Sequence, residues 1–186
     1  MSTSAAPTLT TWNVDATHSS VGFTVKHFFT PVRGKFDRYE VELAYDPENP
    51  AESRVEVRID VTSIDTGNQD RNAHLLSGDF FDAETYPEIT FASEDVRVVA
   101  DGQLVVSGPL TIKDQTQRIE LAVTLDGVKE LPAEMQEAFG GIEQIAGFTA
   151  STRLDRTDYG VGVGSWAAAL GVGHADNLNL AIEANR

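Results

Sequence analysis

The sequence predicts an all-β fold: an extended antiparallel up-and-down β-barrel of about eight strands with one or two short helices. Most apolar segments alternate with polar residues at a period of two, which is typical of strands with one buried face. The polar breaks between segments are too short for crossover helices, so the strands should pair antiparallel. Long consecutive hairpins favour a closed barrel over a two-sheet sandwich, which stays the alternative, because closure removes exposed strand edges.

The alternation is clearest in residues 105–125, VVSGPLTIKDQTQRIELAVTL. A polar break at residues 114–117 separates two alternating runs, which predicts an antiparallel hairpin with one buried face. The apolar positions of the two runs are Val106, Leu110, Ile112, Ile119, Leu121, Val123 and Leu125.

The N-terminal part contains further alternating segments. Residues 1–11 are small and polar, and we expect them to form a disordered tail. Strands are predicted over residues 12–14, 21–27 and 55–61. Another strand is predicted over residues 32–46, where Phe36 and Tyr39 fall on opposite parities. We place a β-bulge near Asp37 and Arg38 to account for this phase change.

Residues 66–79 interrupt the β pattern. Asn68 or Asp70 can cap a helix over residues 71–76, and Gly78 can end it. Strands resume at residues 89–91 and 96–99. Asp101 and Gly102 then predict a tight hairpin turn that leads into the 105–125 segment.

A second short helix is predicted over residues 131–139, because Leu131, Met135 and Phe139 share one helical face. We expect this helix to act as a lid. Residues 148–154 and 178–182 alternate as the last strands, with a glycine-rich loop at residues 156–165. Because no repeat or linker interrupts the pattern, residues 12–186 should form a single domain.

Composition excludes several classes of function. The 186 residues include 14 Lys and Arg against 29 Asp and Glu, a net charge of −15, whereas a nucleic-acid binder needs a basic surface. The absence of cysteine excludes disulfides, thiolate catalysis and cysteine-ligated zinc. The N-terminus lacks a secretory signal pattern, and no apolar run approaches the ~20 residues of a spanning helix. We therefore expect a cytoplasmic protein without an integral membrane segment.

A ligand-binding barrel needs an apolar lining and a few polar groups at one point. Each inward residue could be core or pocket wall, and parity does not distinguish the two. The inward candidates are Val21, Phe23, Val25, Phe36, Tyr39, Val57, Ile59, Phe80, Phe91, Leu110, Ile112, Leu121, Val123, Phe148 and Leu154.

Several polar residues are candidates for contact with a ligand head group. His27 shares its parity with Phe23 and Val25, and His74 belongs to the first predicted helix, near the barrel mouth. The head-group candidates are completed by His18, Arg33, Arg71 and Arg156. Each guanidinium could bind a pyrophosphate through two hydrogen bonds, or form a surface ion pair.

The order of the motifs along the chain resembles the YceI-like family of polyisoprenoid-binding, lipocalin-type proteins. The matching segments are residues 12–19 (WNVDATHS), 25–27 (VKH), 32–36 (VRGKF), 74–81 (HLLSGDFF), 86–93 (YPEITFAS), 108–116 (GPLTIKDQT) and 156–160 (RTDYG). The resemblance implies a lipocalin-like barrel that holds a long-chain isoprenoid, and it makes a homodimer plausible. The chain departs from the family at residues 114–116 (DQT) and in lacking a signal.

The resulting hypothesis is a binding and carrier protein for an amphiphilic polyisoprenoid, an isoprenoid quinone or a polyprenyl (pyro)phosphate, with no other cofactor. One alternative is an enzyme with His27 or His18 as base. No nucleophile elbow and no metal-ligand histidine spacing support it, so we expect no catalytic residues and no metal site. Another alternative is a solid-core barrel that works through protein contacts.

Overall fold

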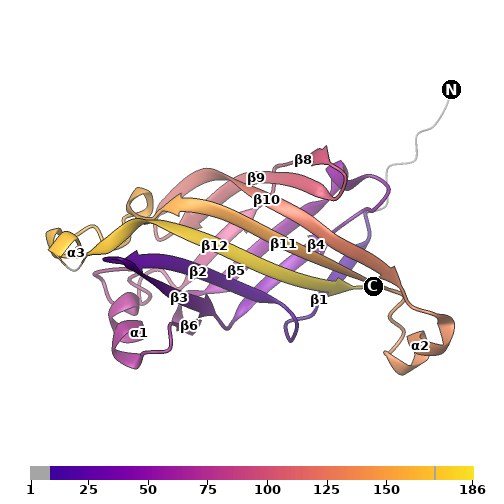
Figure 1. The fold of residues 1–186 in the computed structure, drawn as a ribbon, viewed down its shortest axis with the longest axis horizontal. Helices are drawn as coiled ribbons and strands as arrows, with labels where there is room; N and C mark the ends of the chain where they lie inside the picture. Colours follow the sequence, from indigo (N-terminus) through magenta and orange to yellow (C-terminus); the bar gives the residue numbers. More distant parts are fainter. Residues whose placement is uncertain (1–8, 170) are drawn as a thin grey trace.

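The computed structural model describes residues 9–169 and 171–186, and most of the predicted 1–11 tail lies outside them. The described chain forms a twelve-stranded sheet in which eight antiparallel strands close a barrel, because β1 pairs with both β4 and β12. The barrel predicted from the sequence is confirmed (Figure 1). The eight strands are β1 (Thr11–Val14), β4 (Tyr39–Ala44), β5 (Arg54–Asp60), β7 (Glu88–Ala92), β9 (Gln103–Ile112), β10 (Gln115–Glu130), β11 (Gln144–Asp155) and β12 (Val172–Asn185).

Four further strands extend the barrel. β2 (Ser20–His27) pairs with the first part of β12, whereas β1 pairs with its last residues. β3 (Thr30–Phe36) pairs with β2 and with the short β6 (Ile64–Asp65), and β8 (Asp95–Ala100) pairs with β9. The end of the barrel built by β2, β3 and β6 therefore differs in construction from the end built by β1.

The hairpin predicted over residues 105–125 is confirmed as β9 and β10, with Ile112 opposite Gln115. The predicted bulge near Asp37 and Arg38 is wrong in kind, although its location is correct. The chain breaks there into β3 and β4, which have different neighbours. The Asp37 and Arg38 amides donate to the backbone and side chain of Ser63, in the 3-10 helix η2 (Val61–Ser63), which satisfies them outside the strand ladder.

The helices lie at the two ends of the barrel. α1 (Gln69–Leu76) is capped by Asn68, whose side chain accepts from the Arg71 amide at 2.9 Å, as predicted. α1 and α3 (Ser165–Ala169) lie at one end, and α2 (Ala133–Ala138) lies at the other (Figure 1). Two more 3-10 helices are η1 (Pro50–Glu52) and η3 (Arg156–Tyr159).

The core divides into two clusters. The larger fills the middle of the barrel and reaches the α1 end. The smaller contains Trp12, Tyr45, Ala146, Phe148 and Ala184, near the closing β1–β12 pairing. The Trp12 indole donates to the Tyr45 carbonyl at 2.9 Å, so its polar atom is satisfied inside this cluster.

Candidate ligand-binding cavity

A cavity of about 400 Å³ opens into the barrel interior between β2, β3, α1, η3 and β12. This volume is in the usual range of small-molecule sites. Its walls are predominantly apolar side chains: Phe23, Val25, Val32, Phe36, Leu75, Phe80, Phe81, Ile89, Ile112, Leu154, Val161, Val172 and Leu178. The interior of this part of the barrel is therefore hollow rather than packed.

The sequence candidates other than His18 and Arg33 separate into three groups. Those that line the cavity are Phe23, Val25, His27, Phe36, Arg71, His74, Phe80, Ile112, Leu154 and Arg156. Leu121, Val123 and Phe148 line a second, apolar cavity of about 90 Å³ between β4, β5, β9, β10 and β11. Val21, Tyr39, Val57, Ile59, Phe91 and Leu110 line neither cavity and pack in the larger core cluster.

Arg156 is buried, with 6% of its surface exposed, at the start of η3. Its Nε donates to the Gly173 carbonyl at 2.7 Å, and its Nη1 donates to the carbonyls of Val161 and Gly162 at 2.7 and 2.6 Å. Its Nη2 donates to the Val172 carbonyl at 3.2 Å. Because four of its five N–H donors are used by the backbone, Arg156 holds two loops together and has little capacity left for a phosphate.

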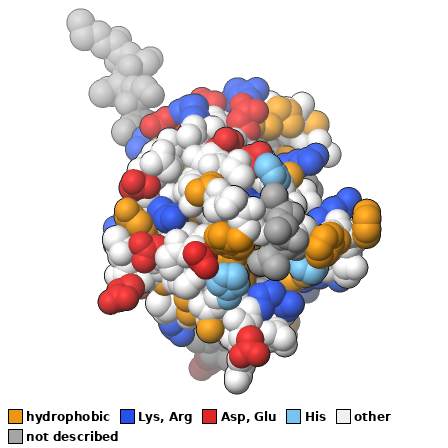
Figure 2. Space-filling model, turned by 90° about the vertical axis from the view of Figure 1, so that its left-hand side faces the viewer, with side chains coloured by type: hydrophobic (Ala, Val, Ile, Leu, Met, Phe, Trp, Pro, Cys, Tyr) orange, Lys and Arg blue, Asp and Glu red, His pale blue; other side chains and the backbone are white. Residues whose placement is uncertain are grey.

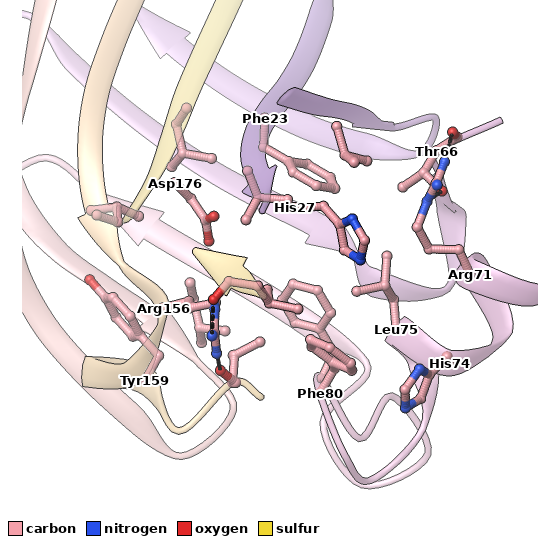
Figure 3. A pocket seen from close by; sticks show the side chains of 18 of the residues that line it. Phe23, His27, Thr66, Arg71, His74, Leu75, Phe80, Arg156, Tyr159 and Asp176 are labelled. Atoms are coloured by element: carbon pink, nitrogen blue, oxygen red, sulfur yellow. Dashed lines mark hydrogen bonds between the residues drawn. The ribbon is translucent and has the colours of Figure 1, made fainter. Parts of the chain in front are cut away.

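Asp176, at the inner wall, was not among the sequence candidates. Figure 3 shows its carboxyl pointing into the cavity from β12, and within the described residues its Oδ1 is buried without a hydrogen-bond partner. The pKa of Asp176 is raised from 3.8 to about 7, chiefly by burial; the nearby charge of Arg156 opposes the shift and that of Asp155 adds to it. Asp176 shares the parity of Leu178, Leu180 and Ile182, so extending that alternation by one step would have found it.

The cavity mouth is polar. Arg71 is exposed there, and its guanidinium donates to the Thr66 hydroxyl at 2.8 Å and the Thr66 carbonyl at 2.6 Å. His74 contacts Asp79 at 3.1 Å, and its ring packs against Phe80 and Trp166. His27 lies on the cavity side of β2, as its parity predicts. It is the last residue of this strand and is exposed to solvent at the mouth.

Two predicted head-group residues lie outside the cavity lining. His18 is exposed in the β1–β2 turn, where its Nδ1 lies 2.9 Å from an Asp15 oxygen. The hydrogen bond to Asp15 raises the pKa of His18, and Glu183 completes a surface group of three possible metal ligands. Arg33 is exposed on β3, on the parity opposite to the cavity-lining Val32. Neither His18 nor Arg33 is placed to bind a head group in this cavity.

The predicted lid is also in the wrong place. The segment expected to cover the barrel is α2, which lies at the end opposite to α1 and α3 (Figure 1). None of its residues borders the cavity within the described chain. The segments at the mouth are instead α1, the β2–β3 hairpin and the loop after η3. Sequence reasoning missed this because it did not establish which end of the barrel is open.

No helix among residues 9–169 and 171–186 has both the length and the apolar character needed to cross a membrane.

Comparison with known proteins gives a consistent family. A model of the YceI-like domain matches residues 12–185. A UPF0312 protein of Vibrio cholerae is 37% identical over 147 residues, which are 78% of this chain and 74% of the relative. A UPF0312 protein of Shewanella sp. (strain ANA-3) is 30% identical, with 92% of this chain and 84% of the relative aligned.

Solved structures share the fold. BcnA of Burkholderia cenocepacia superposes with a TM-score of 0.80 at 26% identity, covering 92% of this chain and 99% of BcnA. The Campylobacter jejuni YceI protein gives 0.71 at 28% identity, covering 84% of this chain and 86% of its own. A polyisoprenoid binding domain from Saccharophagus degradans gives 0.67 at 15% identity, covering 95% and 98%. The family match over residues 12–185, the curated relatives and the barrel together show that this chain belongs to the YceI-like family.

Proposed function

We propose that this protein binds and carries a long-chain isoprenoid lipid in the barrel interior. The observation that carries the proposal is the apolar cavity of about 400 Å³. Burial of an apolar tail against such walls contributes about 25 cal/mol per Å² of surface removed from water. The polyisoprenoid binding of the Saccharophagus domain, which has the same fold, supports the same class of ligand.

Of the two expected head groups, the polar residues favour the isoprenoid quinone over the polyprenyl (pyro)phosphate. The inner wall presents the carboxyl of Asp176, which would repel a phosphate when ionised. Arg156 uses its donors on backbone carbonyls, and Arg71 is hydrogen-bonded to Thr66 at the mouth. A protonated Asp176 can donate a hydrogen bond to a quinone carbonyl, since a neutral carboxylic acid carries one O–H donor.

Native mass spectrometry with lipid extraction tests this proposal. Protein from its own host, or apoprotein incubated with an isoprenoid quinone, should retain the lipid, and a polyprenyl phosphate should bind more weakly. Leu154→Trp should fill part of the cavity and reduce quinone uptake at least tenfold. Val99→Trp, on an exposed strand position outside the cavity, should bind as wild type does.

Two results would contradict the proposal: wild-type protein that takes up no isoprenoid, or Leu154→Trp protein that takes up as much as wild type. The same spectra report oligomeric state. The homodimer and the cytoplasmic location expected from the sequence stay predictions.

A further inference from the structure

The hairpin between β2 and β3 exposes two phenylalanines at the mouth of the cavity. Phe29 is 94% exposed and Phe28 is 56% exposed, although neighbouring residues of the same strands line the cavity wall. Large apolar side chains that are mostly exposed indicate an interaction surface when they cluster beside a site. Figure 2 looks onto this end and shows exposed hydrophobic side chains beside Lys, Arg and His, with some Asp and Glu on the same face.

The backbone holds this hairpin tip in a fixed and costly conformation. Phe28 has a φ of +51°, which is unusual for a bulky residue. Its amide donates to the Gly171 carbonyl at 2.6 Å, and its ring lies where a side chain on Gly171 would collide at 2.4 Å. The Phe28 ring packs edge to face on the His27 ring at 4.9 Å, while Phe29 is left exposed to solvent. Retained strain of this kind is typical of functional segments.

The charge around the tip differs from the charge of the protein as a whole. Lys26 and Arg33 are exposed on β2 and β3, and among the described residues neither forms an ion pair. The net charge of −15 would repel an anionic surface at long range. At physiological ionic strength, however, charges more than about 8 Å from the contact are largely screened. Residues 26–33 contain Lys26 and Arg33 and no Asp or Glu, so the tip itself is basic, although Asp70 and Arg71 of α1 also border the cavity.

We propose that residues 26–33, the hairpin tip, dock on a bilayer surface that contains anionic lipid. Phe29 enters the interface, and Lys26 and Arg33 lie against the head groups, as in interfacial segments that combine apolar burial with basic residues. This orientation turns the cavity mouth toward the membrane. The docking surface does not depend on the cargo, but its use in loading an isoprenoid lipid rests on the proposed function above.

Vesicle co-sedimentation tests the docking directly. Wild type should bind phosphatidylcholine vesicles with 30% phosphatidylglycerol, and bind pure phosphatidylcholine more weakly. Phe29→Ser should weaken binding about tenfold, the lower range expected for transfer of one phenylalanine. Phe139→Ser is the matched control, because Phe139 is 51% exposed on the segment following α2, at the opposite end. Arg33→Gln should reduce the preference for anionic vesicles, whereas Lys129→Gln, also exposed, should not.

Docking is refuted if wild type binds neither vesicle, or if Phe29→Ser binds as wild type does with circular dichroism unchanged. Equal losses of vesicle binding in Phe29→Ser and in Phe139→Ser would also refute docking by the hairpin tip. Transfer of an isoprenoid quinone from the same vesicles separates docking from cargo binding. Phe29→Ser should slow transfer about tenfold without changing final occupancy. Vesicle binding without quinone uptake would overturn the proposed function and leave docking supported.

Discussion

Replacing Asp176 by Asn removes an ionisable group from the cavity wall while keeping the shape of the side chain. The pKa of Asp176 rises from 3.8 to about 7 in the folded protein, chiefly because burial disfavours the charged form. The folded state therefore holds the proton more tightly than the unfolded chain. The stability associated with this proton is fully present below pH 4, is lost as the pH rises through about 7, and changes little above that.

The shift in the pKa of Asp176 sets an upper limit for the pH-dependent change in the free energy of unfolding. A pKa difference between 3.8 and about 7 corresponds to about 4 kcal/mol of unfolding free energy. Solvent reaches part of the side chain, so we expect about 1–3 kcal/mol. The stability advantage of Asp176→Asn over wild type should grow by this amount between pH 4 and pH 8. In thermal unfolding it corresponds to a gain of several degrees in Tm at pH 8.

Urea unfolding of both proteins at pH 4.5, 6 and 8 measures the difference. Asp158→Asn, which removes an exposed carboxylate of η3, is the control and should show no comparable pH-dependent gain. An advantage of Asp176→Asn that is constant across this pH range would show that Asp176 does not titrate as argued. An advantage that decreases with pH would show that a partner stabilises the ionised carboxylate.

The remaining predictions concern ligand binding and backbone packing. Quinone affinity of wild type should fall several-fold above pH 7 as Asp176 loses its proton, and that of Asp176→Asn should stay flat in a fluorescence titration. Arg156→Met should lower the free energy of unfolding, measured in urea, by about 3 kcal/mol, because it leaves buried carbonyls unpaired. The control Arg33→Met removes an exposed side chain and should change this free energy by less than about 0.5 kcal/mol. Gly108→Ala should cost more than about 2 kcal/mol, since its Cβ would lie 1.9 Å from the Ala92 carbonyl oxygen, while Gly78→Ala, in open space, should be near neutral by the same assay.

The parts of the fold that depend on neighbouring residues could be predicted from the sequence. The alternation in β9 and β10 needs only local periodicity, and the Asn68 cap of α1 needs only a side chain three residues before an amide. The break at Asp37 and Arg38 was visible as a phase change. Whether it was a bulge or a corner depended on which strands pair with β3 and β4, and strand pairing is set by tertiary structure.

The roles of the polar site residues could be predicted only in part. The guanidinium of Arg156 suggested a phosphate partner, but its acceptors are carbonyls on residues 161–173, which only the folded loops bring together. Asp176 has the same parity as Leu178 and Leu180, but residues 171–175 before it do not alternate. The sequence pattern therefore did not extend the last strand back to Asp176. In the structure the β12–β2 register shifts between Val172 and Asp176, which explains why the strand pattern begins late.

Whether the barrel is hollow or filled depends on which residues face one another across strands. At the β1 end, Ala146 and Ala184 are direct partners on β11 and β12 and are fully buried. Their small side chains leave room for Trp12, Tyr45 and Phe148 to pack in one cluster, with the Tyr45 and Phe148 rings edge to face at 5.0 Å. The space that remains beside Tyr45 and Phe148 is the smaller cavity of about 90 Å³.

At the α1 end, one aromatic ring of the cavity wall lies over a glycine. The end of the Phe23 ring covers Gly34 on the neighbouring strand, where a Cβ would collide with it at 2.3 Å. Both ends of the barrel contain phenylalanine with inward parity. Neither composition nor periodicity therefore predicts which end is filled and which is hollow. The position of the small residue differs between the two ends. Two alanines paired across β11 and β12 make room for large rings at the β1 end, whereas Gly34 makes room for the Phe23 ring in the wall of the larger cavity.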